Sequence, residues 1–527
     1  MNEIAKTKTN LSDSNFISHI ADWEKYLSLL IFSSDDDLSY KYERQLKWLL
    51  VFKEGLNASV KHNLLLDDIY GDSNLNAYTP SNLVDFDPIQ KCYLSTPIAF
   101  KEIKKAMAAS NLFFLQGPPG TGKTTAIVEI VLQTLKEKPD ARILISAETH
   151  IAVDNALDKI ISILGPEYSD ITYRHKAFHK DSELSSASAS KAELNSKAHD
   201  VFNKAWKNNN SLTDSLLDRF NIKSDSIPNW VAKNISDNSQ IVGVTCNQID
   251  NIIDNNSDDF DLAIIDEVSK ATLPEWIIAL CNAVKVILVG DHKQLPATFC
   301  QEESEVLGAL LKRQEILIRD GVIDKIFVNS PEFMKGMLTT QYRMQPNIGA
   351  FISDTFYDGQ LSHGRVQNED ENANFGWLSY KRTELCPNTE LPKERQVLTN
   401  DSEIKIIEES LKKLDGLVGK STKVALITPY KKQCSGLRRM KDNLSVSNLV
   451  IEVATVDAFQ GREADVVFFS FVRNNGSARF YGDSRRINVA ISRARDRVYL
   501  VGDRDYLRAQ KKYLVLKELL KLKTVTL

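Results

Sequence analysis

Short runs of apolar residues alternate with amphipathic stretches over most of the chain, from Lys101 onward. Uninterrupted apolar runs separated by helical stretches indicate strands of parallel sheets that are covered on both faces. The runs form two series with a break near 320–335, and they predict two α/β domains in tandem. The first series lies at 112–115, 142–146, 241–245, 262–265 and 284–289, and the second at 423–427, 450–454, 465–471 and 497–501.

An N-terminal region and one long interruption flank this pattern. Apolar residues recur every three or four positions within 16–60, among them Phe16, Ile20 and Trp23, so we expect helices there. Residues 158–240 are polar and rich in Ser, Ala, Asn and Lys, which predicts a helical insertion in the first domain. The predicted boundaries are a helical N-terminal region at 1–93, a first domain at 94–325 and a second domain at 326–527.

The insertion contains a basic stretch that runs from Arg174 to Lys180. Two interpretations are open at this stage, a contact with nucleic acid and a solvated charged face. Residues 1–93 and 158–240 are also the candidate surfaces for a protein partner.

Composition indicates the cellular environment of the protein but does not identify its function. The chain has 527 residues and a net charge of −4, so any basic track for nucleic acid must be local. Its six cysteines are scattered without a C-x-x-C pair, which argues against a zinc site or a disulfide framework. The sequence has no run of about 18 apolar residues and no signal-peptide pattern, so we expect a cytoplasmic protein that is not in a membrane.

A glycine-rich loop directly follows the apolar run 112–115, and a helix is predicted from Lys123 to about residue 136. Strand, loop and helix in this order form a P-loop, whose backbone N–H groups and helix N-terminus suit a triphosphate. We expect Lys123 to bridge the β- and γ-phosphates of ATP and the Thr124 hydroxyl to hold Mg²⁺. The predicted nucleotide-binding residues here are Gly117, Pro118, Pro119, Gly120, Thr121, Gly122, Lys123, Thr124 and Thr125.

Two polar groups follow later strands of the first series. Asp266 and Glu267 come directly after the run 262–265. Ligands of parallel sheets bind at the carboxyl ends of the strands, so carboxylates at this position can contact them. We expect Asp266 to hold Mg²⁺ and Glu267 to orient and deprotonate the attacking water. Gln294 follows the run 284–289, and its neutral amide is suited to sensing the γ-phosphate.

Six motifs in order resemble those of superfamily 1 helicases. They are G-P-P-G-T-G-K-T, D-E-V-S-K-A at 266–271, G-D-H-K-Q-L-P-A at 290–297, Q-Y-R-M at 341–344, T-V-D-A-F-Q-G-R-E-A-D at 455–465 and N-V-A-I-S-R-A-R at 488–495. The chain is most similar to the branch that contains the nonsense-mediated-decay helicase, senataxin and the immunoglobulin-mu-binding helicase. The resemblance covers about 95–505 and implies two RecA-like domains that hydrolyse ATP between them.

The resemblance assigns further residues to the nucleotide. Arg343 and Arg493 match the two arginines that reach the γ-phosphate, and Arg485, Arg486, Arg495 and Arg497 crowd near the second of them. Tyr342 resembles the aromatic residue that stacks on the base. Gln460, Gly461 and Glu463 resemble the segment that couples the nucleotide to the domain interface, with Glu463 as a candidate for the ribose.

The resemblance also implies contacts with the nucleic-acid backbone. Thr149 and His150 match one contacting motif, although the family usually has Ser or Asn where this chain has His150. Thr245 and Thr455 match hydroxyls that bond phosphates, a role that grips the strand without reading bases. Plain β-propensity is the alternative reason for a Thr at a strand end. Asn400 and Glu403 match a family element, but we interpret them as a helix cap.

Two features depart from the family. A Gln usually precedes the P-loop by about 18–20 residues; here that region reads Y-L-S-T-P-I-A-F, and Gln90 lies further upstream. The first 90 residues look helical and too short for the small β-barrel that branch members often carry.

The sequence therefore predicts an ATP-dependent translocase or helicase that moves along single-stranded DNA or RNA, in the 5′→3′ direction by resemblance. The alternative is a nucleotide-gated clamp or remodelling module that binds nucleic acid without unwinding it. A small-molecule kinase would not explain the motifs at 340–500, and no further carboxylate cluster points to a nuclease.

Overall fold

A computed structural model describes residues 16–34, 36–54, 66, 85–92, 96–165, 171–174, 238–253, 260–366, 374–378, 398–418, 421–476 and 478–525. The chain divides into two compact units. The first comprises Met1–Gly117, Lys123–His292 and Pro296–Leu338, and the second comprises Pro118–Gly122, Lys293–Leu295 and Thr339–Leu527. Most of the P-loop and the segment around Gln294 thus group with the second unit.

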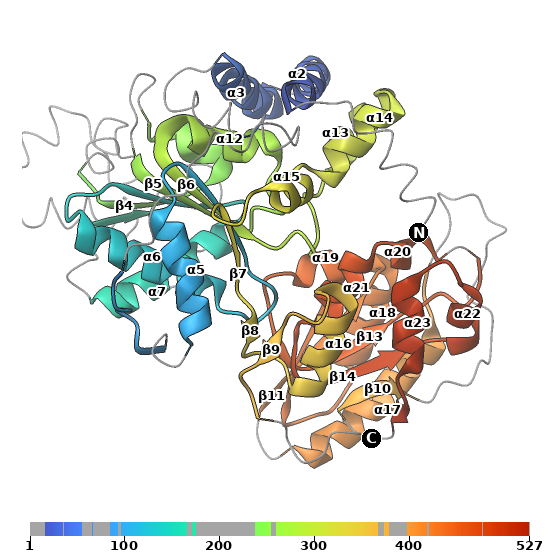
Figure 1. Ribbon diagram of the computed structural model, residues 1–527. Helices are drawn as coiled ribbons and strands as arrows, with labels where there is room; N and C mark the ends of the chain where they lie inside the picture. The colour runs from blue at the N-terminus through green and yellow to red at the C-terminus, as the bar shows by residue number, and fades with distance from the viewer. Residues whose placement is uncertain are drawn as a thin grey trace, which may run out of the picture. The chain divides into compact units, whose positions relative to one another are not determined.

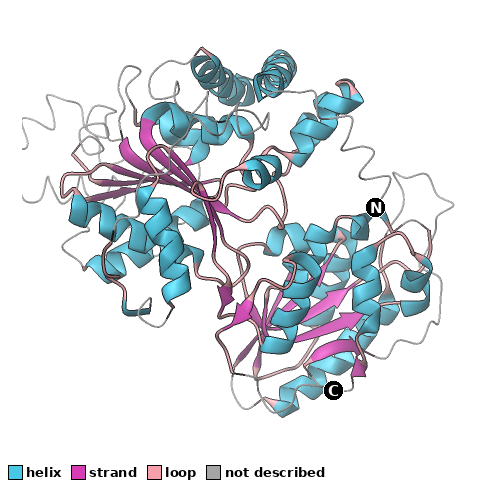
Figure 2. Cartoon of the chain, viewed as in Figure 1, coloured by secondary structure: helices cyan, strands magenta, loops and turns pink. Residues whose placement is uncertain are grey.

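The first unit is built on a seven-stranded sheet in the order β3-β4-β2-β5-β6-β1-β7, and all of its pairings are parallel (Figures 1 and 2). The five apolar runs predicted for this domain all form strands. The strands are β1 (Leu112–Gln116), β2 (Ile143–Ala147), β3 (Thr172–Arg174), β4 (Ile241–Thr245), β5 (Phe260–Asp266), β6 (Ala283–Gly290) and β7 (Lys335–Met337).

Helices cover both faces of this sheet because successive side chains of a strand point to opposite faces. Phe113 and Leu115 face a core shared with α5 (Pro97–Ala108), α6 (Lys123–Glu137) and α7 (His150–Leu164). Leu112 and Phe114 face the opposite core, which includes α12 (Leu273–Asn282). Figure 1 shows these two helical layers on either side of the sheet.

The N-terminal helices belong to the second of these layers. α2 (Phe16–Ser33) and α3 (Asp36–Lys53) pack against each other, and α3 packs on α12. Trp23, Trp48 and Phe52 of this pair are buried in the same core as the sheet. The remaining elements on this side are η4 (Cys246–Asn251), α13 (Gln301–Ala309), α14 (Lys312–Asp320) and α15 (Ile323–Asn329).

The second unit contains a six-stranded sheet in the order β12-β11-β13-β14-β10-β15, again with only parallel pairings. Its strands are β10 (Phe375–Leu378), β11 (Thr422–Thr428), β12 (Leu449–Thr455), β13 (Ala464–Ser470), β14 (Ala494–Val501) and β15 (Thr524–Val525). A short parallel pair, β8 (Thr340–Gln341) and β9 (Ser362–His363), precedes them in the chain.

Helices pack on both faces of the second sheet. α17 (Asp401–Leu417) and α18 (Lys431–Asp442) share one core with Val424 and Phe468, and α21 (Ser484–Ile491) packs on β13. The other helices are α16 (Pro346–Phe356), α19 (Val456–Phe459), α20 (Arg479–Gly482), α22 (Arg504–Ala509) and α23 (Leu514–Lys521). Two tandem α/β units with RecA-like parallel sheets confirm the predicted fold class.

The division between the units differs from the expected 325/326 boundary. The structure places it between Leu338 and Thr339, because β7 pairs with β1 at the edge of the first sheet. The described part of 1–93 belongs to the first unit rather than forming one of its own. Within 158–240, the structure describes the end of α7, β3 and the three residues that precede β4, and most of the expected helical insertion lies outside the described residues.

Arg174 fits neither of the two interpretations of the basic stretch. Its side chain is fully buried, so it is neither a solvated charge nor a nucleic-acid contact. The guanidinium Nε donates to Asp154 Oδ1 at 2.6 Å, and Nη2 lies 2.9 Å from His150 Nδ1. The pair joins β3, at the edge of the sheet, to α7. The rest of the basic stretch, from residue 175 to Lys180, lies outside the described residues.

Asn400 caps α17 as expected, but the Glu403 side chain binds the segment after β13. Asn400 Oδ1 accepts the backbone N–H of Glu403 at 3.1 Å. The Glu403 carboxylate accepts the Ser470 hydroxyl at 2.6 Å and the backbone N–H of Val472, which has a φ of 72°. Burial raises the pKa of Glu403 to about 8.

Among the described residues, no helix is long and apolar enough to span a bilayer.

Replacing Arg174 by Met is expected to destabilise the first unit by about 3–5 kcal/mol, because Asp154 is left buried without its counter-charge. The free energy of unfolding from urea titrations measures this loss. Lys138→Met removes a solvent-exposed ion pair to Asp261 of β5 and serves as the control, with a much smaller expected loss because water screens this pair. Equal losses for the two variants would contradict the buried pairing.

Candidate nucleotide-binding and nucleic-acid-binding site

The glycine-rich loop leaves β1 at the centre of the site. The N–H of Gly117 donates to the Gly290 carbonyl at the end of β6, 2.8 Å away, which fixes where the loop starts. Gly120 and Gly122 have φ values of 74° and 84°, a region that side chains other than glycine rarely adopt. The Thr121 hydroxyl donates to the Pro118 carbonyl at 2.7 Å, which closes the turn on itself.

Lys123 starts α6 and folds back over the beginning of the loop. Its ammonium donates to the Gly117 carbonyl at 2.8 Å. A methyl group on Gly117 would overlap the Lys123 side chain, so the glycine is needed at this position for the lysine to lie where it does. Thr124 and Thr125 follow in the first turn of the same helix, and Lys159 of α7 donates to the Thr125 hydroxyl.

The acid pair lies at the end of β5, between β2 and β6. Asp266 is buried, and Glu267 has a φ of 52°, a left-handed conformation unusual for a glutamate. The N–H of Glu267 donates to Asp266 Oδ1 at 2.8 Å, and its carboxylate pairs with Lys270 at 3.0 Å. Such strain is typical of functional turns.

Burial raises the pKa of Asp266 to about 6, and the charge of Glu267 adds to this effect. Lys123 lowers the same pKa, so the lysine and this carboxyl group lie within electrostatic range of each other. The Thr124 hydroxyl and the Asp266 carboxylate are hard oxygen donors. One or two such groups together with phosphate oxygens are the usual protein site for Mg²⁺, so the residues fit the expected ion.

Four of the predicted nucleotide residues form two contacts in the second unit. Arg493 is buried and donates through Nη2 to Gln294 Oε1 at 2.9 Å. Arg343 pairs through Nε with Glu463 Oε2 at 2.7 Å and also donates to the Ser492 carbonyl. The Glu463 carboxylate, which the sequence assigned to the ribose, is thus engaged by an arginine.

The other residues predicted here are placed around them. The N–H of Tyr342 donates to the Gly120 carbonyl at 2.9 Å, and its ring is half exposed beside Gly364. An exposed aromatic ring is what base stacking requires. Gly461, with a φ of 82°, lies in the turn between Phe459 and β13.

The residues predicted to grip nucleic acid in the first unit lie at one sheet edge. Thr245 ends β4, and its register partner Ala147 ends β2, two residues before Thr149. The Thr149 hydroxyl accepts the N–H of Ala152 at 3.3 Å and so caps α7. His150 follows it and contacts the buried Arg174. Thr149 and Thr245 are therefore neighbours at the ends of paired strands.

Thr455 has the equivalent position in the second unit. It ends β12, and its hydroxyl accepts the N–H of Ala458 at 3.4 Å as the cap of α19. A local capping role thus accounts for the threonines at 149 and 455, whereas the Thr245 side chain caps no helix.

Two residues near the site were not among the predicted site residues, although the sequence marks Gln90 as lying upstream of the P-loop. Gln90 is buried against α6, where its amide donates to the Thr125 carbonyl at 2.9 Å and its N–H donates to Glu129. Asp291 accepts the Gln116 amide at 3.2 Å beside the start of the P-loop. Gln90 lies further from the P-loop than the Gln of the family pattern, so spacing alone does not identify it.

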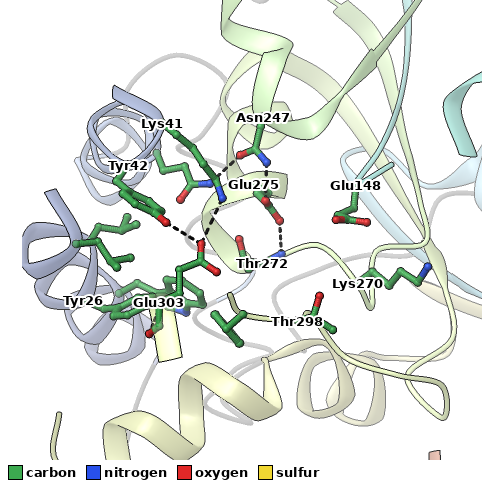
Figure 3. A pocket seen from close by; sticks show the side chains of 15 residues that line it. Tyr26, Lys41, Tyr42, Glu148, Asn247, Lys270, Thr272, Glu275, Thr298 and Glu303 are labelled. Atoms are coloured by element: carbon green, nitrogen blue, oxygen red, sulfur yellow. Dashed lines mark hydrogen bonds and ion pairs between the residues drawn. The ribbon is translucent and has the colours of Figure 1, made fainter. Parts of the chain in front are cut away.

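A polar pocket of about 110 Å³ lies in the first unit beside these segments (Figure 3). Glu148 precedes Thr149, Asn247 follows Thr245 by two residues, and Lys270 belongs to the turn after the acid pair; all three line it. The opposite wall comes from α2 and α3, including Tyr26, Lys41 and Tyr42. Burial raises the pKa of Glu148, and the nearby Glu275 raises it further.

A strand-loop-helix cradle for phosphates, with an acid pair after a neighbouring strand, defines the class of P-loop nucleoside triphosphatases. Family models described as AAA domain match both units, one at 99–178 and 167–302 and the other at 323–505. With relatives that include the ATP-dependent helicases upf1 and NAM7, these matches show that the chain belongs to the superfamily 1 helicases, in the branch of those two proteins. This confirms the resemblance inferred from the motifs.

Three relatives illustrate the similarity. The chain is 27% identical to the mouse DNA-binding protein SMUBP-2 over 89% of its own length and 48% of that protein. It is 31% identical to the DNA polymerase alpha-associated DNA helicase A of Saccharomyces cerevisiae, over 77% of the chain and 64% of the relative. It is 31% identical to the ATP-dependent helicase NAM7 of the same yeast, over 74% and 40%. The chain thus spans roughly half the length of these relatives.

Gly117→Ala is expected to weaken ATP binding by about 10- to 100-fold, because the added methyl group displaces Lys123 and removes a charged hydrogen bond to phosphate. Equilibrium binding of a fluorescent ATP analogue measures the change. Gly308→Ala, in α13, meets no atom within 4 Å and is the matched control. Binding by Gly117→Ala within twofold of the unaltered chain would refute this role of the glycine.

Proposed function

We propose that the protein is an ATP-dependent translocase or helicase that moves along single-stranded nucleic acid. The supporting observation is that one edge of the first sheet carries the phosphate loop after β1, the acid pair at the end of β5, Thr149 after β2 and Thr245 at the end of β4. ATP and the single-stranded nucleic acid would therefore bind to loops of the same sheet. The names of the relatives, which include DNA-binding and helicase proteins, agree with this proposal.

The residues of the first unit divide the work at ATP between them. Lys123 binds phosphate oxygens, and Glu267 orients a water molecule and accepts its proton. Thr124 and Asp266 would hold Mg²⁺, which supplies charge neutralisation on the phosphates when bound. The left-handed backbone of Glu267 and its pairing with Lys270 set the direction in which the carboxylate points.

The second unit contributes cations and the sensor amide. Arg343 and Arg493 would pair with the γ-phosphoryl oxygens, where a loose transition state accumulates charge. Gln294 already accepts a hydrogen bond from Arg493, so a change at the phosphate that moves one of them moves the other. Thr455 would hold the strand on this unit, and repeated ATP cycles would shift its grip relative to that of Thr245, in the 5′→3′ direction.

ATP hydrolysis is expected to rise when single-stranded DNA or RNA is added, and the rates with no polymer, with DNA and with RNA identify the substrate. Glu267→Gln should lower the stimulated rate by about 10²- to 10⁴-fold with ATP binding retained, because the general base is lost. Lys123→Ala should abolish binding as well. Glu302→Gln, on the exposed face of α13, is the control for loss of one acid.

Turnover that survives both Lys123→Ala and Glu267→Gln would show that the site is elsewhere. Strand separation of a tailed duplex decides between the motor and the clamp. A chain that hydrolyses ATP on single strands but never separates the duplex would instead be the nucleotide-gated clamp.

ATP turnover is expected to fall as the pH drops through about 6, because the Asp266 carboxyl group, whose pKa is raised to about 6, then becomes protonated and cannot ligate Mg²⁺. Protons and Mg²⁺ compete for this group, so more Mg²⁺ should move the acidic midpoint to lower pH. Rate–pH profiles at several Mg²⁺ concentrations measure the shift. A midpoint that is independent of Mg²⁺ would exclude Asp266 as the titrating ligand.

A further inference from the structure

The segment that follows Thr245 is held from outside the sheet. Thr245 ends β4 and leads directly into η4, a single short 3₁₀ helix. Cys246 and Ile249 anchor η4 in the core, whereas its Asn247 and Asp250 contact α3. The position of the Thr245 hydroxyl therefore depends on what fixes η4.

Arg44 of α3 grips η4 at two points. Its guanidinium pairs with the Asp250 carboxylate through both Nε and Nη2, and Nη2 also donates to the Asn247 carbonyl at 2.6 Å. The side chains of Arg44 and Asp250 are only 17% and 11% exposed, so this bidentate pair is largely shielded from water. Bidentate pairs of this kind fix geometry as well as charge.

Gln45, the next residue of α3, extends the contact. Its amide donates to Asn247 Oδ1 at 2.7 Å, and the Asn247 amide donates to Glu275 Oε1 at 2.7 Å. Glu275 caps α12 by accepting the N–H of Thr272 at 2.6 Å. Figure 3 shows Asn247, Glu275 and Thr272 joined in this way across the pocket. Asn247 is thus fixed from α3 on one side and from α12 on the other.

Polar and apolar contacts hold the α2–α3 pair on the rest of the first unit, so it can serve as a support for η4. Tyr42 donates to Glu303 Oε1 at 2.9 Å, and Tyr26 donates to the Glu303 carbonyl at 3.0 Å. Burial of Trp48 and Phe52 against the same core adds apolar attachment. Because the α2–α3 pair is held in this way, its contacts with η4 fix the position of η4.

We propose that Arg44 and Gln45 are positioning residues of the nucleic-acid grip, which hold η4 so that Thr245 meets a backbone phosphate. This inference rests on the proposed function, because it assigns Thr245 to the strand. It predicts that the N-terminal helices set the affinity for the polymer without taking part in ATP hydrolysis.

The test is ATP turnover of the full chain titrated with single-stranded oligonucleotide. Arg44→Ala should raise the half-saturating oligonucleotide concentration about threefold to tenfold, because one phosphate hydrogen bond is lost. The rate without oligonucleotide and the rate at saturation should not change. Arg44→Lys keeps the charge but not the fork, so it should restore the affinity only in part.

Asp250→Asn tests the same pair from the other side and carries the test if Arg44→Ala fails to fold. It should give a shift in the same direction, and the double variant should be no worse than Arg44→Ala alone, because Arg44→Ala already removes the ion pair to Asp250. Lys53→Ala breaks an ion pair to Glu24 within the helical pair, remote from η4, and should leave the affinity unchanged.

Thr245→Val separates failure of this inference from failure of the proposed function. If Thr245→Val raises the half-saturating concentration but Arg44→Ala and Asp250→Asn do not, or if these two act additively, the positioning role is wrong. If the unaltered chain is stimulated by neither DNA nor RNA, the proposed function fails first.

Discussion

Parallel pairing of strands that are buried on both faces is the constraint on which the first unit depends. Such pairing brings the carboxyl ends of all strands to one edge, so each loop that leaves a strand there is a candidate for chemistry. The register shows how closely this is done. Gln116 pairs with Gly290, and Ala147 pairs with both Asp266 and Thr245. The phosphate loop, the acid pair and Thr245 therefore start within about one residue of the same level across the sheet.

The same constraint explains how much of the fold was predictable. Every uninterrupted apolar run became a strand within a few residues, because burial on both faces leaves no polar alternation to obscure the signal. β7 and β15 carry no such run and exist through their pairing with β1 and β10. A strand that forms only through pairing with its neighbour has no characteristic pattern in its own residues. The sequence therefore does not reveal β7, and the predicted boundary at 325/326 comes before it.

The candidate site divides along the same principle. Residues that follow a strand or lie in the glycine loop could be located because their function requires that local setting, as with Lys123 and Asp266. Contacts between distant segments could not. Arg174 is paired with Asp154 in α7, and Arg44 is paired with Asp250 in η4; neither pattern is periodic, and both depend on the packed fold. A charged residue in a sequence is predicted to be exposed to solvent. Only a buried partner of opposite charge, which the sequence does not reveal, makes its burial favourable.

The strand order of the first sheet has a consequence for synthesis on the ribosome. β1 emerges early, yet its two neighbours are β6 and β7, the last strands of the unit. Pairings between segments so distant in sequence form late and slowly. The nascent chain therefore cannot complete its phosphate cradle until translation has passed Met337, so a truncated first unit would be unable to sequester nucleotide.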